Sequence, residues 1–582
     1  MEIVAAANHG REEKNEGRQR WANKTEFFLT LVGYAVGIGN VWRFPYLCYM
    51  NGGAAFLIPY IIVLLTLGIP VFTLELMTGQ RFQKSALAVW PSISKYFQGI
   101  GWSSFVVNIY VNIYYNIIVS WCFIYLFYSF EDPLPWTRTT DSFGNVTMDG
   151  EIFFYGNQML DRSKDISHPG PVPWRLGLSL TLAWVVVYAI IYKGIESSGK
   201  VVYFTATFPY FVLLIMVITG CSLPGAGNGL KYYLIPDGSK LADSMVWIKA
   251  AEQVFYSLGV GYGTHTSFAS FNPKDHDCFF DAMTIPFINA GTSFFAGFAV
   301  FSTLGYLAQE QNTDVSDLSA GGFGLAFIAY PEALAEMPAG NFFSFLFFFM
   351  LLLLAIDSQF AMTETVIVCL NDLKYVLLPR WVVEHPKQKD IVTVSVCFVS
   401  WLIGFAFVCR AGYYVISVID GLTAGFGLLS VAAAQMICVL SIYGPKKYIN
   451  DFCIIAGVEK QIKYRYFLQY IEFMWTYVTP YLAVALALST VIVLCGSDNF
   501  DFYICNTDDV PESECEKSRW AISLGLFFCF LAFAPIPVGA LHQLYREKYL
   551  GIADTPYATG DTSSPEKFGS DSGGSNPIHV KK

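Results

Sequence analysis

Charged side chains are scarce in this sequence. Only 14% of its 582 residues are aspartate, glutamate, lysine or arginine, whereas 54% are hydrophobic, and the mean hydropathy is clearly positive at +0.45. A soluble chain of this length needs a much more polar surface to stay in water. The scarcity of charge therefore excludes an ordinary soluble protein and predicts a membrane protein.

Groups that carry enzyme chemistry are scarce as well. The chain has seven histidines, and its sequence contains no glycine-rich nucleotide loop, no histidine–cysteine cluster with metal spacing and no nucleophile elbow. We therefore expect no enzyme. The net charge of −10 does not point to nucleic acid as a partner, because it is divided between the two sides of a membrane.

Long apolar runs fill the chain instead. A helix crosses the hydrocarbon core of a bilayer with roughly 20 mostly apolar residues. The run 201–223 carries no charge, and the run 57–77 carries one, Glu75. Twelve such candidates begin near residues 26, 54, 98, 175, 200, 245, 282, 342, 392, 412, 467 and 520. We predict an all-α polytopic membrane protein with twelve transmembrane helices.

Lysine and arginine in short loops favour the cytoplasmic side of a membrane. Basic residues precede the first span and recur in the loops 80–98, 379–389 and 443–465, whereas the loops 129–172 and 498–516 lean acidic. An even number of spans then places both termini in the cytoplasm. We expect a multi-pass plasma-membrane protein with a cytoplasmic tail (1–25), a transporter domain (26–545) that includes a large outer loop (about 130–174), and a disordered cytoplasmic tail (546–582).

Two outer loops carry candidates for covalent modification. Asn145 begins the sequence NVT, a glycosylation acceptor on the predicted outer face. Cys505 and Cys515 share the outer loop before the last span. Whether they form a disulfide stays open.

The first span is unusually easy to break. The stretch GYAVGIGNVWRFPY (33–46) holds three glycines within seven residues, followed by Asn40 and Arg43. Glycines alone would be explained by close helix packing, but Asn40 and Arg43 are costly at membrane depth unless they face a partner or a wet cavity. The sixth span repeats the pattern with FYSLGVGYG (255–263).

Glycine-interrupted spans at matching positions of the two halves of a chain indicate the binding site of a secondary transporter. Unwound backbone leaves carbonyl oxygens free for cations. Spans one to five and six to ten are thus predicted to form two repeats.

Three stretches carry a resemblance to a known family: GYAVGIGNVWRFPYLCYMNGGAAFLIPY (33–60), VFYSLGVGYGTHTSFASFN (254–272) and LLLLAIDSQFAMTET (351–365). They closely resemble the neurotransmitter sodium symporters, the sodium- and chloride-coupled carriers of glycine, proline, GABA, monoamines and other amino acids. The resemblance covers nearly all of 20–545. It implies twelve spans, a five-plus-five inverted repeat with spans one and six broken, and alternating access around a midplane site.

The resemblance implies two sodium ions and one chloride ion. It assigns the first sodium to Ala35, Asn40, Ser257 and Asn289, and the second to Gly33, Val36, Leu354, Asp357 and Ser358. It assigns chloride to Tyr60, Gln253, Ser257 and Ser293. Chloride-independent relatives carry a carboxylate where this chain has Ser293. Because serine leaves the sodium charge uncompensated, we expect chloride dependence.

Gly37 bears most directly on the substrate. Monoamine carriers of the family have an aspartate there, whereas carriers of amino acids and GABA have glycine, so that the substrate's own carboxylate completes the first sodium's shell. Tyr115 matches the tyrosine that donates to that carboxylate. The implied pocket consists of Tyr34, Gly37, Val111, Tyr115, Tyr256, Gly259, Tyr262, Gln359 and Met362.

The bulky aromatics of this pocket favour a small neutral amino acid. The segments FYSLG and DSQF read most like the glycine and proline carriers. Tyr262, however, stands where glycine carriers usually have tryptophan and GABA carriers a smaller aliphatic residue. GABA transport, or a non-transporting protein that binds the substrate as a sensor, stays open as an alternative.

The resemblance also implies two gates. Arg43 and Asp420 match the outer charge pair, with Tyr256 and Tyr115 as the lid over the substrate. Arg18, Trp21 and Asp372 match the inner gate. Phe271 stands where the family often has a tyrosine, so one hydrogen bond of that gate is expected to be lost. The oligomeric state is not predicted.

Overall fold

The computed structural model describes residues 18–140, 146–318, 322–496 and 520–550. Its described part is almost entirely helical, apart from the short antiparallel strands β1 (Thr139–Thr140) and β2 (Val146–Met148). The prediction of an all-α polytopic membrane protein is confirmed. Asn145, Cys505 and Cys515 lie outside the described residues, so the predicted glycosylation and disulfide stay predictions.

Nine helical stretches among the described residues are long and apolar enough to cross a membrane. They are Gly53–Phe82, Lys95–Tyr128, Trp174–Ile191, Ile195–Ser222, Cys278–Glu310, Gly340–Asp372, Gln388–Phe407, Gly412–Tyr443 and Arg465–Ile492. The helices that the site uses are α4 (Leu57–Val63), α5 (Ile69–Phe82), α7 (Gln98–Tyr128), α10 (Ile195–Thr205), α15 (Cys278–Glu310), α17 (Gly340–Asp372) and α21 (Gly412–Cys438).

Broken helices account for the remaining predicted spans. The helix α1 (Lys24–Ala35) continues at an angle of 53° into α2 (Ile38–Val41) and α3 (Arg43–Met50), and α28 (Trp520–Phe533) bends by 46° into α29 (Pro535–Leu550). Counting each bent pair as one span gives up to eleven in the described chain. The predicted sixth span consists of α13 (Ser244–Leu258) and α14 (Thr264–Ala269), which are each too short to cross alone.

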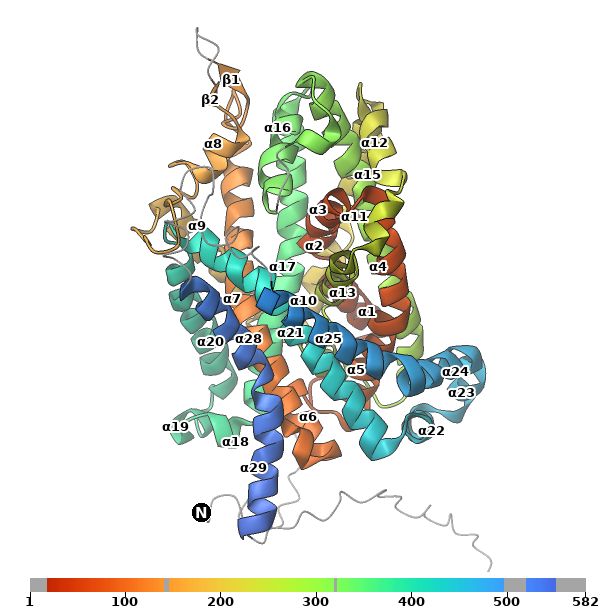
Figure 1. Ribbon diagram of the computed structural model, residues 1–582. Helices are drawn as coiled ribbons and strands as arrows, with labels where there is room; N and C mark the ends of the chain where they lie inside the picture. The colour runs from red at the N-terminus through yellow and green to blue at the C-terminus, as the bar shows by residue number, and fades with distance from the viewer. Residues whose placement is uncertain (1–17, 141–145, 319–321, 497–519, 551–582) are drawn as a thin grey trace, which may run out of the picture.

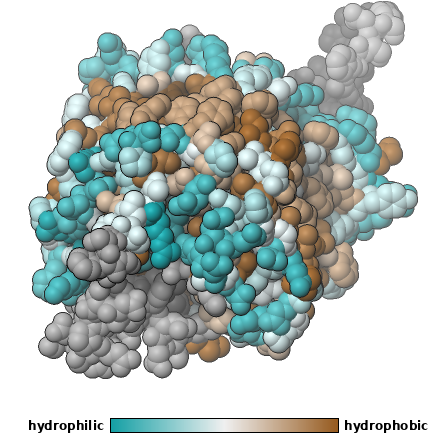
Figure 2. All heavy atoms as spheres, turned by 90° about the horizontal axis from the view of Figure 1, so that it is seen from above, coloured by the Kyte–Doolittle hydropathy of each residue, from teal (hydrophilic) through white to brown (hydrophobic). Residues whose placement is uncertain are grey.

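The interrupted first and sixth spans lie inside the bundle, as Figure 1 shows for α1, α2 and α13. The long helices α7 and α17 pack along each other, and α1 contacts both α15 and α17. The outside of the bundle is apolar, with Val185, Phe211 and Leu402 all more than half exposed. Figure 2 shows such hydrophobic side chains, in brown, along the flanks of the molecule. This apolar flank matches the hydrocarbon of a bilayer.

The predicted basic loops lie on the opposite face from the described part of the acidic loop 129–172 (Figure 1). The helices α6 (Ala86–Ile93), α19 (Arg380–Val383) and α22 (Pro445–Ala456), from the basic loops, lie at the lower face of the view, and α8 (Gly150–Tyr155), from the acidic loop 129–172, lies at the upper face. This separation agrees with the loop assignment; which face is cytoplasmic stays a prediction.

Two loops of the upper face are held together by a partly buried carboxylate. Glu332 of α16 (Tyr330–Ala335) accepts a hydrogen bond of 2.8 Å from the Gly150 N–H at the start of α8. Burial raises the pKa of Glu332 to about 7, and the charges of Asp149 and Glu151 act in the same direction, against the Gly150 N–H and Arg138.

This raised pKa predicts a pH-dependent contact. A carboxyl group whose pKa is higher in the folded state than in the unfolded state stabilises the fold at low pH, and this contribution is lost as pH rises through the folded pKa. We expect the α8–α16 contact to resist a protease better at pH 6 than at pH 8. E332Q should remove that difference, whereas E336Q, at an exposed glutamate of the same segment, should keep it. Equal slopes for E332Q and the parent would contradict the assignment to Glu332.

Candidate functional site

The first helix is interrupted in the middle of the bundle. α1 ends at Ala35, Val36 has φ −90° and ψ 81°, and Gly37 is extended before α2 begins. The Gly37 N–H donates to Asn40 Oδ1 at 3.0 Å, which stabilises the new helix start. The break therefore lies inside the predicted stretch 33–46 and frees backbone carbonyls at mid-bundle depth.

The second interruption depends on glycine directly. Gly259, Gly261 and Gly263 have φ values of +68°, +91° and +79°, a region that side chains other than glycine rarely adopt. The Gly261 N–H donates to Glu75 Oε1 at 3.1 Å, and Gln435 Nε2 donates to the same oxygen at 2.8 Å. Glu75 thus provides a hydrogen-bond acceptor for the unwound backbone at Gly261. The sequence marked Glu75 only as the single charge of the run 57–77 and did not indicate this role.

A small cavity lies between the two interruptions. Its volume is about 30 Å³, roughly that of one water molecule in the liquid. It is lined by Tyr34, Ala35, Gly37, Gly39, Asn40, Val111, Tyr115, Tyr256, Ser257, Gly259, Tyr262, Ser358 and Met362. All the predicted substrate residues except Gln359 are among them, and no charged side chain is.

Gln359 lies beside the cavity and is used elsewhere. Its Nε2 donates to the backbone carbonyl and to Oδ1 of Asn112, both at 2.9 Å. Asn112 also accepts from Thr363 at 2.7 Å. This arrangement fastens α17 to α7 behind the pocket, a role that the sequence pattern did not indicate.

Gly37 is where the cavity leaves no room for a side chain. A Cβ added there would lie 2.7 Å from Ser358 Oγ and 3.1 Å from Tyr115 Oη. Both distances are shorter than ordinary contacts of a Cβ. The two hydroxyls therefore face the Gly37 backbone directly, and an acidic side chain in its place would displace them.

Amide and hydroxyl groups converge at the first predicted sodium position. Asn40 contacts Asn289 Oδ1 at 2.6 Å, and Asn289 contacts Ser257 Oγ at 3.0 Å. All three residues are buried. Ala35, the fourth predicted ligand, lines the same cavity as Asn40 and Ser257. The structure therefore brings this set together from α1, α2, α13 and α15.

A buried carboxylate marks the second predicted sodium position. Asp357 of α17 is 1% exposed, and neither of its oxygens accepts a hydrogen bond that meets the distance and angle criteria among the described residues; the Thr205 hydroxyl of α10 acts on its charge. A Cβ added to Gly33 would lie 2.5 Å from Asp357 Oδ2. A buried charge without donors is costly unless a cation balances it. Asp357 and Gly33 thus fit a cation position.

The remaining predicted ligands of the second sodium belong to α17 and to the end of α1. The Ser358 hydroxyl donates to the Tyr34 carbonyl at 3.1 Å, which ties α17 to the interrupted first helix. Val36 directly follows the last residue of α1, and Leu354 precedes Asp357 by nearly one turn of α17. The carbonyl groups of Gly33, Val36 and Leu354 are neutral oxygen donors of the kind that alkali cations accept.

Hydroxyl groups also gather at the predicted chloride position. Tyr60 of α4 has both Ser257 and Ser293 beside its hydroxyl. Ser293 accepts from Asn40 at 2.8 Å, and Gln253 Nε2 donates to the Gly39 carbonyl at 3.3 Å. Asn40 therefore links this group directly to the first cation position. None of the four side chains is charged.

The outer gate residues meet above the cavity. Arg43 Nε lies 3.8 Å from Asp420 Oδ2, its guanidinium lies 4.5 Å from the centre of the Tyr256 ring, and Nη1 donates to Gln253 Oε1 at 3.3 Å. The Tyr114 hydroxyl donates to Asp420 Oδ1 at 2.9 Å. Sequence reasoning did not include Tyr114, since only packing places it against Asp420.

The inner gate residues also meet. Arg18 binds Asp372 Oδ1 at 2.9 Å and donates to Ser270 Oγ at 2.7 Å, and the Trp21 indole donates to the Phe268 carbonyl at 3.1 Å. The Arg18 guanidinium lies 4.8 Å from the centre of the Phe271 ring. Phe271 thus contributes a cation–π contact to this gate while Ser270 supplies the neighbouring hydroxyl. The contacts predicted for both gates are formed in this structure.

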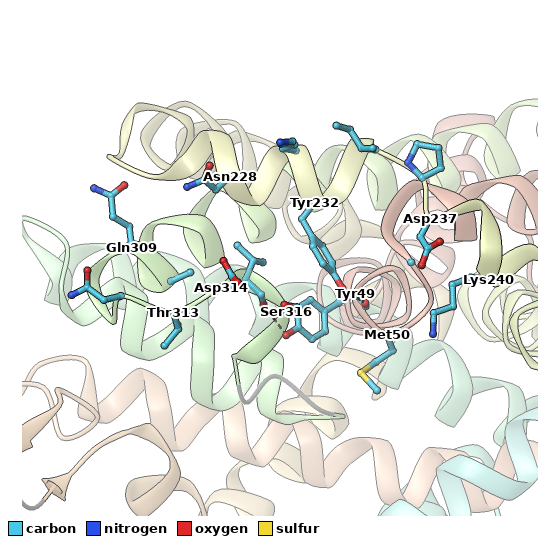
Figure 3. Close-up of a pocket in the computed structure, with 17 residues that line it drawn as sticks. Tyr49, Met50, Asn228, Tyr232, Asp237, Lys240, Gln309, Thr313, Asp314 and Ser316 are labelled. Carbon is cyan, nitrogen blue, oxygen red and sulfur yellow. Dashed lines mark hydrogen bonds between the residues drawn. The ribbon is translucent and has the colours of Figure 1, made fainter.

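A larger cavity of about 770 Å³ lies apart from this site, on the upper face. It is bounded by the end of α3, by α12 (Ala226–Leu234) and by the end of α15. Figure 3 shows Tyr49 and Tyr232 at its centre, where the Tyr232 hydroxyl donates to the Tyr49 carbonyl at 2.9 Å. Its lining shares no residue with the cavity at the broken helices.

Comparison with known proteins agrees with the geometry. The sodium:neurotransmitter symporter family matches residues 18–547 of the chain. The chain is 39% identical to the sodium- and chloride-dependent GABA transporter 2 of Macaca fascicularis, over 92% of the chain and 88% of that protein. It is 41% identical to the sodium- and chloride-dependent taurine transporter of Bos taurus, over 83% and 79%. It is 36% identical to the human sodium- and chloride-dependent neutral and basic amino acid transporter B(0+), over 93% and 88%.

Proposed function

This chain belongs to the sodium:neurotransmitter symporter family, and we propose that it imports a small neutral amino acid across the plasma membrane, coupled to sodium and chloride. It is a multi-pass membrane transporter and not an enzyme. The uncharged cavity at the two broken helices is the observation that carries the choice of substrate class.

A cavity without charged side chains favours a substrate whose own charges cancel. At Gly37 the hydroxyls of Tyr115 and Ser358 face bare backbone. Ser358 donates to the Tyr34 carbonyl, so Tyr115 is the donor that the binding site offers to a carboxylate, and the cavity has no anionic side chain for an amine-only substrate. The substrate's carboxylate then supplies the negative charge beside the first sodium. A zwitterionic amino acid meets these requirements, and a monoamine does not.

The ions take the positions that the buried groups provide. The first sodium binds Ala35, Asn40, Ser257 and Asn289, and the second binds Gly33, Val36, Leu354, Asp357 and Ser358. Chloride binds Tyr60, Gln253, Ser257 and Ser293. The hydrogen bond between Asn40 and Ser293 puts the anion next to the first sodium, which supports joint binding of the two ions.

The gates convert ion binding into transport. Opening the Arg43–Asp420 contact admits ions and substrate from outside, and opening the Arg18–Asp372 contact releases them inside. Two sodium ions, one chloride and a zwitterion carry about one net positive charge, and each charge contributes roughly 2.3 kcal/mol per 100 mV. Uptake is therefore electrogenic. The predicted even number of spans places both termini in the cytoplasm.

A second candidate substrate is GABA or a similar amino acid with a distant amino group. It is favoured by the relatives whose names specify GABA and taurine. The cavity of about 30 Å³ is small for either candidate, so its volume does not choose between them. A non-transporting sensor is less favoured, because the buried oxygen groups of both sodium positions are complete.

The test is radiolabelled uptake in oocytes with glycine, proline, alanine, GABA, taurine and serotonin, each with and without sodium and chloride. We expect one of the neutral amino acids to be taken up only when both ions are present. Uptake of GABA or taurine alone would select the second candidate. Uptake of serotonin alone would contradict the role given to Gly37, and no uptake by surface-expressed protein would favour the sensor.

A further inference from the structure

A second ion pair lies beside the outer gate and has no part in the sites described above. Lys249 Nζ donates to Glu252 Oε2 at 2.9 Å, both on α13. The Glu252 side chain is 4% exposed, whereas that of Lys249 is 25% exposed. The carboxylate is thus nearly buried, with a partner that still reaches water.

Glu252 is connected to the gate through its neighbours on α13. Gln253, the next residue, accepts from Arg43, and Tyr256, one turn further on, lies under the Arg43 guanidinium. Glu252 also acts electrostatically on Arg43. The pair therefore shares a helix with two contacts of the outer gate.

Glu252 also reaches across to α21, the helix that carries Asp420. A Cβ added to Gly425 of α21 would overlap Glu252 Oε1 and would lie 3.0 Å from its Cδ. The carboxylate thus occupies the space that a side chain at 425 would fill. Gly425 is helical and needs no special backbone conformation. The presence of glycine at this position is therefore explained by the space that Glu252 occupies and not by its φ angle.

We propose that Lys249, Glu252 and Gly425 form a second latch of the outer gate. When the gate closes, the Glu252 carboxylate packs against Gly425 of α21, and Lys249 neutralises its charge. Separation of α21 from α13 would expose the carboxylate to water. Without Lys249, closing the gate would bury an uncompensated charge, and the open state would gain population. The inference rests on the proposed alternating access. It assigns Lys249, Glu252 and Gly425 the role of positioning residues in the outer gate.

The test measures gate opening without measuring transport. V111C, at a cavity-lining residue, is introduced together with C221S, which removes an exposed cysteine. A membrane-impermeant methanethiosulfonate is applied from outside, and the modification rate per surface molecule is compared with that of protein lacking the reporter. Because no substrate is moved, failure of the latch and failure of the proposed function give separate results.

We expect K249M to raise the modification rate about tenfold, less than loss of a fully buried partner would, because Lys249 is partly exposed. The double variant K249M/E252Q should return toward the parent rate, since no charge is left to bury. G425A should raise the rate by filling the seat, and E252A should cancel much of that effect. The matched control K200M removes the lysine of the exposed Lys200–Glu196 pair and should change nothing.

Three results would overturn the latch. The first is an equal modification rate for K249M, K200M and the parent. The second is a K249M/E252Q rate as high as that of K249M. The third is a loss of surface protein in K249M with an unchanged rate per molecule, which would indicate a purely structural role.

Discussion

If Asp357 holds the second sodium, replacing it with asparagine should reduce sodium-driven uptake by about 100-fold or more. The carboxylate is 1% exposed and accepts no hydrogen bond that meets the distance and angle criteria among the described residues, so we expect a cation to balance its charge. The neutral amide keeps the size of the side chain but removes the charge. Its NH₂ group would also point donors at the position of a cation.

The measurement is uptake at a series of sodium concentrations, corrected for surface expression. D357N should show neither uptake nor a sodium-dependent rise, whereas D390N, at an exposed aspartate of α20 (Gln388–Gly404), should match the parent. Undiminished uptake by D357N, with the parent's dependence on sodium, would show that Asp357 is a structural charge and would remove the second sodium from this position.

Glutamate in place of Ser293 is expected to free uptake from its need for chloride. Ser293 is fully buried, beside Tyr60 and hydrogen-bonded to Asn40. A carboxylate there supplies, as a fixed charge, the negative charge that chloride otherwise brings next to the first sodium. The longer side chain also fills the space between the hydroxyls.

The measurement is uptake in chloride compared with uptake in gluconate. The parent should lose nearly all uptake in gluconate, whereas S293E should show similar uptake in both salts. S293A, which adds no charge, should remain chloride-dependent or inactive. An S293E variant that transports well but still requires chloride would place the anion elsewhere.

Much of the fold could be predicted from the sequence because membrane helices and their interruptions have local causes. The glycines of 259–263 have positive φ at three positions, as a cluster of glycines allows, and the first break falls at Val36 and Gly37. A criterion based on helix length alone undercounts the membrane spans. α13 and α14 are each too short to be counted, since the break that matters for function divides the span.

The candidate site was predictable where the resemblance supplied residues, and the structure brings most of them around one cavity. Contacts between residues that lie far apart in the sequence were not predictable. Glu252 meets Gly425, more than 170 residues away, and Tyr114 meets Asp420 only through helix packing. Gln359 turns to Asn112 instead of lining the cavity, because the partner amide lies within reach. Such pairs depend on tertiary distances, for which neither periodicity nor a motif gives a signal.

The central claim is that two ion gradients drive uptake of a zwitterionic amino acid. The most direct measurement uses purified protein in liposomes, preloaded with potassium gluconate and diluted into sodium chloride, with the labelled amino acid selected by the uptake panel. The account predicts accumulation above the external concentration, increased by an inside-negative potential, lowered when the inward gradient of either ion is removed, and abolished when sodium or chloride is absent outside. Equilibration to the external concentration at the same rate without these gradients would contradict coupled symport.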